Sequence, residues 1–207
     1  MGLFDFFKTK KYGGFVAAYK LEKFWDHLLE EERAYTKECL SKLKSGDESF
    51  KTGNMDDPKI KIKKVEESVD QFLFALGTKI STLKNYTLAE KLLTHAAMLS
   101  KNPTIKHQIL NELIDLYYKQ REDRLDAIEK CKIYCQQDIE LYPSLKEKSE
   151  ITYDSVESFK RLAIIFEREE KYKEAIKVSE LAILYGLKDG TKGGYEGRID
   201  KLMKKLS

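Results

Sequence analysis

The chain has 207 residues, of which 35% are charged and 42% are hydrophobic, and it contains only 3 prolines. Because a proline inside a helix costs about 3 kcal/mol, this composition favours long amphipathic helices. The 38 basic and 35 acidic side chains nearly cancel, so we expect no nucleic-acid partner. Its apolar runs fall far short of the ~20 residues that a membrane-spanning helix needs.

An N-terminal helical region is expected over residues 1–44. Its first segment mixes lysines with large apolar residues, as segments that lie on a membrane surface do, and these apolar residues are Leu3, Phe4, Phe6 and Phe7. Membrane contact through them stays open, as does packing onto the helices that follow. After Gly13 and Gly14, a single helix is predicted over 15–43. Its apolar face would consist of Leu21, Phe24, Trp25, Leu28 and Leu29.

Residues 45–59 are polar and aperiodic, which predicts a loop or linker. From Ile60 to Leu83, apolar residues recur every three or four positions and predict a helix. Pro143 should end a later helix and leave 144–153 as a connector, and Gly186 should end another. We expect residues 60–207 to form one domain. Its further helices are predicted over 87–99, 104–119, 126–142, 155–169, 173–185 and 198–206.

One pattern of residue spacings occurs three times in this domain. The first copy reads Leu73-x2-Leu76-Gly77-x2-Ile80, then Tyr86-x2-Ala89-x6-Ala96. The last copy has the same spacing: Phe159-x2-Leu162-Ala163-x2-Phe166, then Tyr172-x2-Ala175-x6-Ala182. The middle copy, Leu110-x2-Leu113-Ile114-x2-Tyr117, reaches its small residue Ala127 only after one extra turn residue. Each copy is typical of two helices whose backbones approach closely at a small residue.

This pattern resembles the tetratricopeptide repeat family over roughly two-thirds of the chain. The chain departs from the family because each copy lacks the usual tryptophan, and because Ser179 stands where a large ring is common. The copies also lie farther apart in the sequence than in a regular array, where one repeat follows the next every ~34 residues. The resemblance implies an all-α fold, an α-α superhelix of about three helical hairpins, with helix 198–206 as its C-terminal cap.

The resemblance further implies a scaffold that binds a protein or peptide in a concave groove lined by the first helix of each pair. The groove would mix polar, aromatic and charged side chains. It lacks the Lys, Asn and Arg cluster with which some relatives clamp a terminal carboxylate. Its expected binding residues are Gln71, Phe74, Thr78, Ser81, Gln108, Asn111, Asp115, Tyr118, Glu157, Lys160, Ile164, Glu167 and Arg168.

We expect no catalytic activity, metal or cofactor, because the reactive side chains lack suitable partners in the sequence. Cys131 and Cys135 face the same way on one helix, but no second pair of Cys or His at matching spacing completes a zinc site. The 3 cysteines, without a secretory signal, predict reduced thiols and a cytoplasmic location. The histidines are isolated from one another and are His27, His95 and His107.

Two alternatives to a plain binding module remain open. The chain could be a peptide-responsive switch in which the N-terminal helix docks and releases, with residues 45–58 as the hinge. It could instead be a peripheral membrane protein anchored by its first seven residues. The sequence identifies neither the partner nor the oligomeric state.

Overall fold

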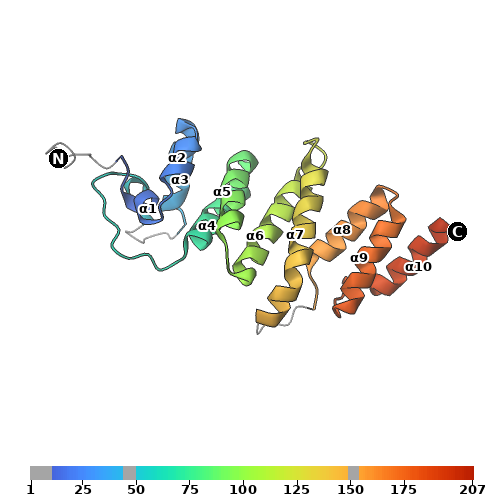
Figure 1. Cartoon of the computed structure of the whole chain (residues 1–207). Coiled ribbons are helices and arrows are strands. Elements are labelled where there is room, and N and C mark those ends of the chain that lie inside the picture. Colours follow the sequence, from blue (N-terminus) through green and yellow to red (C-terminus); the bar gives the residue numbers. More distant parts are fainter. Residues whose placement is uncertain (1–10, 44–49, 149–153) are drawn as a thin grey trace, which may run out of the picture. The chain divides into compact units, whose positions relative to one another are not determined.

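The computed structural model describes residues 11–43, 50–148 and 154–207, and this part of the chain is helical with no strand (Figure 1). Consecutive helices pack against each other as pairs, which confirms the predicted all-α helical-repeat fold. The chain divides into two compact units, residues 1–99 and 100–207. The division therefore lies in the middle of the predicted repeat domain and not in the predicted linker at 45–59.

The first unit begins with three short helices, so the single helix predicted over 15–43 is wrong. They are α1 (Gly14–Ala18), α2 (Glu22–His27) and α3 (Glu30–Ser41). Lys20 adopts a left-handed backbone with φ of 58° between α1 and α2. Leu28 is extended, with ψ of 141°, between α2 and α3. The helix breaks at these two positions because neither conformation continues an α-helix.

The segment after residue 50 packs onto these helices instead of forming a free linker. It contains the short 3-10 helix η3 (Thr52–Asn54). The Val16 N–H donates to the Met55 carbonyl at 2.9 Å, and the buried Trp25 Nε1–H donates to Asp56 at 3.1 Å. Residues 45–49 of the predicted hinge lie outside the described residues.

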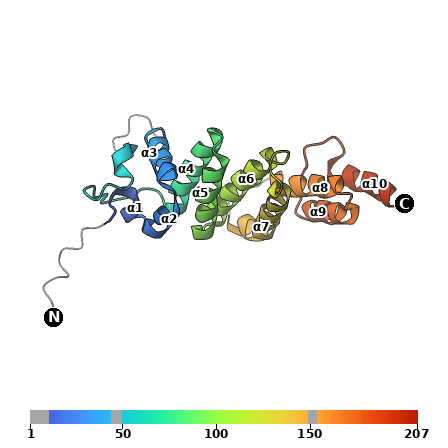
Figure 2. The same cartoon turned by 90° about the horizontal axis from the view of Figure 1, so that it is seen from above.

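A capping box on Ser68 decides where α4 (Val69–Thr82) begins, well after the predicted start at Ile60. The Ser68 N–H donates to the Gln71 side chain at 3.1 Å. This helix packs against α5 (Tyr86–Leu99), as Figure 2 shows. A methyl group at Gly77 would lie 2.7 Å from Leu93 Cγ. The small residue of the first copy therefore permits this close contact.

The second unit consists of five helices among its described residues: α6 (Pro103–Lys119), α7 (Ala127–Lys148), α8 (Glu157–Arg168), α9 (Tyr172–Leu184) and α10 (Gly194–Leu206). The predicted stop at Pro143 is wrong, since α7 continues through it. Tyr142 and Leu145, on either side of this proline, are buried in a core with Phe159. Their packing holds the helix together despite the missing proline N–H. Residues 149–153 of the predicted connector lie outside the described residues.

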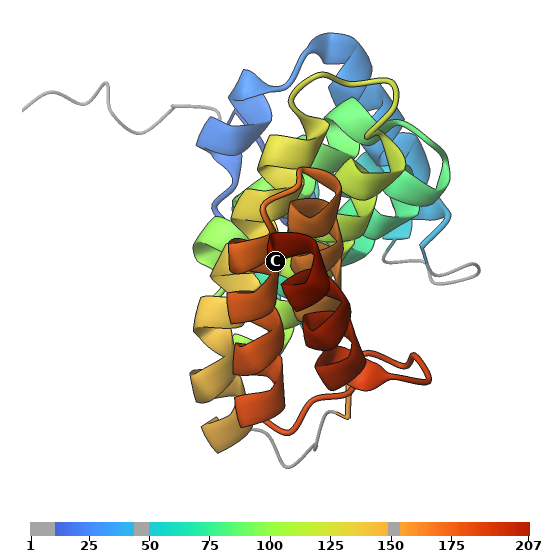
Figure 3. The ribbon, with the colours of Figure 1, turned by 90° about the vertical axis from the view of Figure 1, so that its right-hand side faces the viewer.

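The second unit also contains the predicted small-residue contacts and helix stop. Ala127, Ala175 and Ala182 are fully buried, and Gly186 follows α9 with φ of 76°. Figure 3 shows α10 beside α9, where Leu202 packs on Ala175 and Ile176. The predicted capping helix is thus present, although it begins at Gly194 and not at Arg198. Within the described ranges, no helix is both long and apolar enough to cross a membrane.

Candidate functional site

The predicted groove residues on α4 belong to the first unit, whereas those on α6 and α8 belong to the second. The Gln71 side chain already accepts hydrogen bonds from Ser68 in the capping box. Phe74 and Thr78 are half-buried. Ser81 is only 4% exposed, so its prediction as an exposed contact residue is wrong. It lies on the buried face of α4, which the spacing of first-helix positions did not reveal.

On α6, Gln108 is exposed and Asn111 joins a buried polar network. The Asn111 side-chain nitrogen lies 3.0 Å from His107 Nε2, and His107 Nδ1 lies 2.7 Å from the buried carboxylate of Asp138 on α7. Asn111 is therefore packed, and His107 is not isolated as the sequence suggested. Asp115 forms an exposed ion pair with Lys119 at 2.6 Å.

Tyr118 brings α6 and α8 together within the second unit. The Arg161 guanidinium lies 3.7 Å from the centre of its ring, and that of Arg121 lies 4.5 Å away. Arg161 also pairs with Glu157 at 2.5 Å. These arginines were not among the predicted binding residues, because their cation–π contacts depend on how the helices pack.

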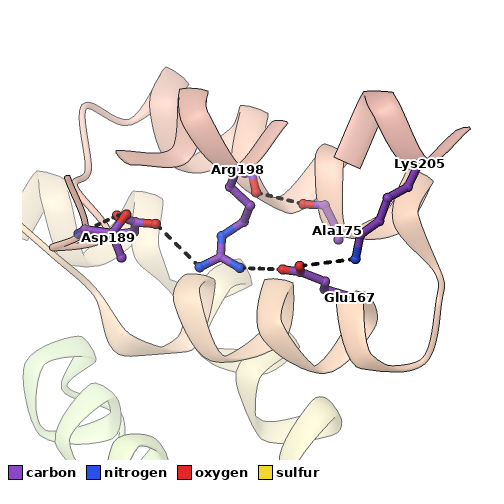
Figure 4. Close-up of polar contacts among 7 residues, drawn as sticks. Glu167, Ala175, Asp189, Arg198 and Lys205 are labelled. Carbon is purple, nitrogen blue, oxygen red and sulfur yellow. Dashed lines mark hydrogen bonds and ion pairs between the residues drawn. The ribbon is translucent and has the colours of Figure 1, made fainter. Parts of the chain in front are cut away.

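The remaining predicted residues on α8 differ in their surroundings. Lys160 and Ile164 are half-buried and Arg168 is exposed. Glu167 contacts the capping helix, since Arg198 on α10 binds it at 2.9 Å and Lys205 at 3.7 Å (Figure 4). Arg198 also lies 3.5 Å from the buried Asp189. Glu167 therefore fastens α10 to α8.

Burial would raise the pKa of Asp189, but hydrogen bonds from Thr191 and the charge of Arg198 outweigh it and lower the pKa overall. Asp189 is therefore a carboxylate at neutral pH and can hold Arg198 on the side away from Glu167. The ion pairs around Arg198 thus belong to the packing of the cap.

The first unit contains a cleft of about 470 Å³ between α2 and α5, which the sequence did not reveal. Its surface is mainly apolar and is formed by Phe24, His27, Leu28, Thr87, Glu90, Lys91, Thr94, His95 and Met98. The contributions from α5 recur every three or four residues from Thr87 to Met98. At 1.5 Å per residue, this stripe is about 16 Å long, or about three turns of a helix.

Two stacked rings belong to the lining of the cleft. The rings of Phe24 and His95 are 4.3 Å apart and almost parallel, at 9°. Burial lowers the pKa of His95 below its ordinary value of 6.5, so its imidazole is neutral at neutral pH. At the end of the cleft, Met98 is 76% exposed. The cleft therefore presents a mainly apolar, partly aromatic surface to solvent, with Glu90 and Lys91 as charged residues in its lining.

An ion pair between α3 and α5 supports one wall of the cleft. Lys91 Nζ lies 2.6 and 2.8 Å from the two carboxylate oxygens of Glu32. Burial would raise the pKa of Glu32, but hydrogen bonds from Lys91 and from the Leu29 N–H outweigh it and lower the pKa overall. Glu32 is therefore ionised at neutral pH and holds Lys91 at the rim.

Two features of the sequence concealed this cleft. On α5, its residues occupy the face opposite the buried one, where polar side chains usually mark a solvated surface. Phe24 on α2 and Leu28, which directly follows it, were assigned to the apolar face of one long helix, which the structure breaks. The signal that the sequence did offer is Met98, a large apolar residue on the otherwise polar face of α5.

The structure also shows where the reactive side chains lie. All three cysteines are free and buried. In residues 11–43, 50–148 and 154–207, no three His, Cys, Asp or Glu side chains are grouped so that they could hold a metal ion.

No protein-family model matches the chain, and no solved structure matches it significantly. The chain is similar to an uncharacterized protein of Aquifex aeolicus (strain VF5). The two are 28% identical over 217 aligned positions, which cover 99% of this chain and 98% of that protein. The similarity therefore extends across both compact units. Because that protein is uncharacterized, the similarity does not indicate which activity either protein has.

Proposed function

We propose that this chain is a non-enzymatic binding module that holds a helix or peptide of a protein partner in the cleft between α2 and α5. The cleft itself carries the proposal, because a mainly apolar concavity with a few polar groups at its rim is the usual form of a binding site. Its length along α5 suits three turns of an amphipathic helix, which would insert side chains at positions i, i+3 or i+4, and i+7.

Two further observations support a protein partner. The helical pairs resemble tetratricopeptide repeats, whose role is protein binding, although fold resemblance alone is an analogy. Met98 projects from the cleft, and methionine adapts its flexible, polarisable side chain to varied apolar partners. Free, buried cysteines fit a reducing compartment and support a cytoplasmic location.

Peptide selection on the purified full chain tests this proposal. Random peptides displayed on phage would be enriched on the wild type and then measured against Met98→Asp, which places a charge in the cleft. The matched control is Leu125→Asp, because Leu125 is fully exposed in the turn between α6 and α7. We expect Met98→Asp to weaken peptide binding at least about tenfold, corresponding to about 1.4 kcal/mol, and the control to have no effect.

Circular dichroism would verify that both variants remain folded. Peptides that bind Met98→Asp as tightly as the wild type would contradict the assignment of the cleft.

A further inference from the structure

A non-helical segment of the first unit, residues 61–65, is anchored beside α1 at both of its ends. The Gly14 N–H donates to the Ile60 carbonyl at 2.9 Å, and the Tyr19 hydroxyl donates to the Glu67 carbonyl at 3.1 Å. In Figure 1 the segment is part of the long trace that leads into α4. Because the fold fixes both ends, a partner would meet a chain that is already positioned, which lowers the entropy cost of binding.

The backbone between these two anchors is unpaired and extended. The N–H and C=O groups of residues 61–65 form no hydrogen bond with another described residue. None of these residues has a positive φ, and exposed residues alternate with half-buried ones from Lys59 to Lys63. An alternation of period two is the property of a β-strand. The segment therefore resembles a lone strand whose free backbone groups can pair with a further strand.

The side chains that this segment turns to solvent are positively charged. Lys59, Lys61, Lys63 and Lys64 are exposed and form no ion pair within the described ranges. A single exposed acid, Glu66, follows them. Pairing with a second copy of this chain would place lysines opposite lysines, which is destabilising. The segment therefore suits a strand whose own outward side chains are acidic.

We propose that residues 61–65 bind an acidic, extended peptide of a protein partner, which adds beside them as a second strand. Backbone hydrogen bonds would hold the peptide, and carboxylates at alternate positions would pair with Lys61 and Lys63. The half-buried Ile62 and Val65 keep the other face of the segment against the molecule. None of these residues lines the α2–α5 cleft, so this surface does not depend on the function proposed for the cleft.

Hydrogen–deuterium exchange in the full chain tests the geometry. The probe is a fluorescein-labelled peptide in which glutamate and valine alternate, and its control carries glutamine in place of glutamate. The amides of residues 61–65 should exchange rapidly in the free chain. At saturating probe, about half of them should slow at least about tenfold, because an added strand pairs with one edge only. Exchange in α8 to α10 should not change.

Charge variants test which lysines hold the peptide. Lys61→Gln/Lys63→Gln should weaken binding of the glutamate peptide at least about threefold, measured by fluorescence anisotropy, because two cross-strand charge pairs are lost. The matched control is Lys173→Gln/Lys177→Gln, which removes the same charge from exposed lysines on α9 and should have no effect. Met98→Asp should also leave this binding unchanged, which separates the segment from the cleft. Circular dichroism would verify that all variants remain folded.

A modified peptide separates strand addition from attraction between charges. Methylation of its backbone nitrogens keeps every carboxylate but removes the N–H donors that a strand needs. We expect the methylated peptide to bind at least about tenfold more weakly than the parent, because its backbone can no longer donate to the segment. Equal binding of the two peptides would mean that charge alone attracts the probe, and would overturn the proposal.

Other results would also overturn it. Absence of slower exchange at millimolar probe would mean that no strand forms. Slowing that grows with the concentration of the chain, without probe, would assign the segment to a second copy. Flotation on anionic vesicles that Lys61→Gln/Lys63→Gln abolishes, with no slowing by the probe, would assign it to a membrane surface. The residues for which the sequence predicts membrane contact lie outside the described part of the chain and are Leu3, Phe4, Phe6 and Phe7.

Discussion

At the scale of single residues, a buried hydrogen bond joins two helices of the second unit. His107 on α6 lies 2.7 Å from Asp138 on α7, and Asp138 is almost fully buried. Asp138→Ala should lower the free energy of unfolding by about 1–3 kcal/mol, because it leaves the imidazole without its buried partner. Urea denaturation followed by circular dichroism measures this change.

The control for this prediction is Asp115→Ala, also in the second unit. Its ion pair with Lys119 is largely exposed, and such pairs on a helix contribute only about 0.3–0.5 kcal/mol. Equal losses in the two variants would mean that the buried bond contributes no more than a surface pair.

At the scale of helices, Gly77 and Leu93 set the distance between α4 and α5. Gly77→Ala would place a methyl group 2.7 Å from Leu93 Cγ, and Leu93 is fully buried. We expect this variant to lose about 1–3 kcal/mol of stability from overpacking, despite the better helix propensity of alanine.

Gly197→Ala on α10 is the matched control for Gly77→Ala. A methyl group there would meet no atom within 4 Å, so Gly197→Ala should gain about 0.5–1 kcal/mol from reduced freedom of the unfolded chain. Denaturation curves of both variants check these opposite signs. A gain in both would show that α4 and α5 can move apart at little cost.

At the scale of the whole molecule, the chain forms two compact units. A substitution that destabilises one unit should therefore increase local unfolding in that unit and not in the other. Hydrogen–deuterium exchange with mass spectrometry measures this. Gly77→Ala should speed amide exchange in α4 and α5 and leave α8 to α10 unchanged, whereas Asp138→Ala should speed exchange in α6 and α7 and leave α4 and α5 unchanged. Faster exchange throughout the chain in either variant would mean that the units unfold together.

Local sequence signals were sufficient to predict several helices of both units. Apolar residues that recur every three or four positions predicted α5, α6 and α9 to within about two residues. This worked because helix periodicity and the residues that begin or end a helix depend only on a few neighbouring positions. Asn102 begins α6 by accepting the Thr104 N–H at 2.9 Å, and Gly186 ends α9. The spacing of the small residues Gly77, Ala127 and Ala175 likewise indicated close helix contacts.

Contacts between distant residues explain the errors. The three short helices at the start of the chain depend on residues that lie far ahead, since Trp25 bonds to Asp56 and Val16 to Met55. Pro143 stays inside α7 because its neighbours Tyr142 and Leu145 are buried against later helices. Neither outcome follows from local propensity, which tertiary packing can override.

The sequence by itself determined an all-α chain of helical pairs with a C-terminal cap, because helix periodicity and small residues are local properties. Only the tertiary structure decided which surfaces are open. It buried Ser81, placed Asn111 in a network and turned Glu167 toward α10. It also formed the cleft from α2 and α5, whose lining residues lie some sixty positions apart. A surface of this kind exists only after distant helices have packed.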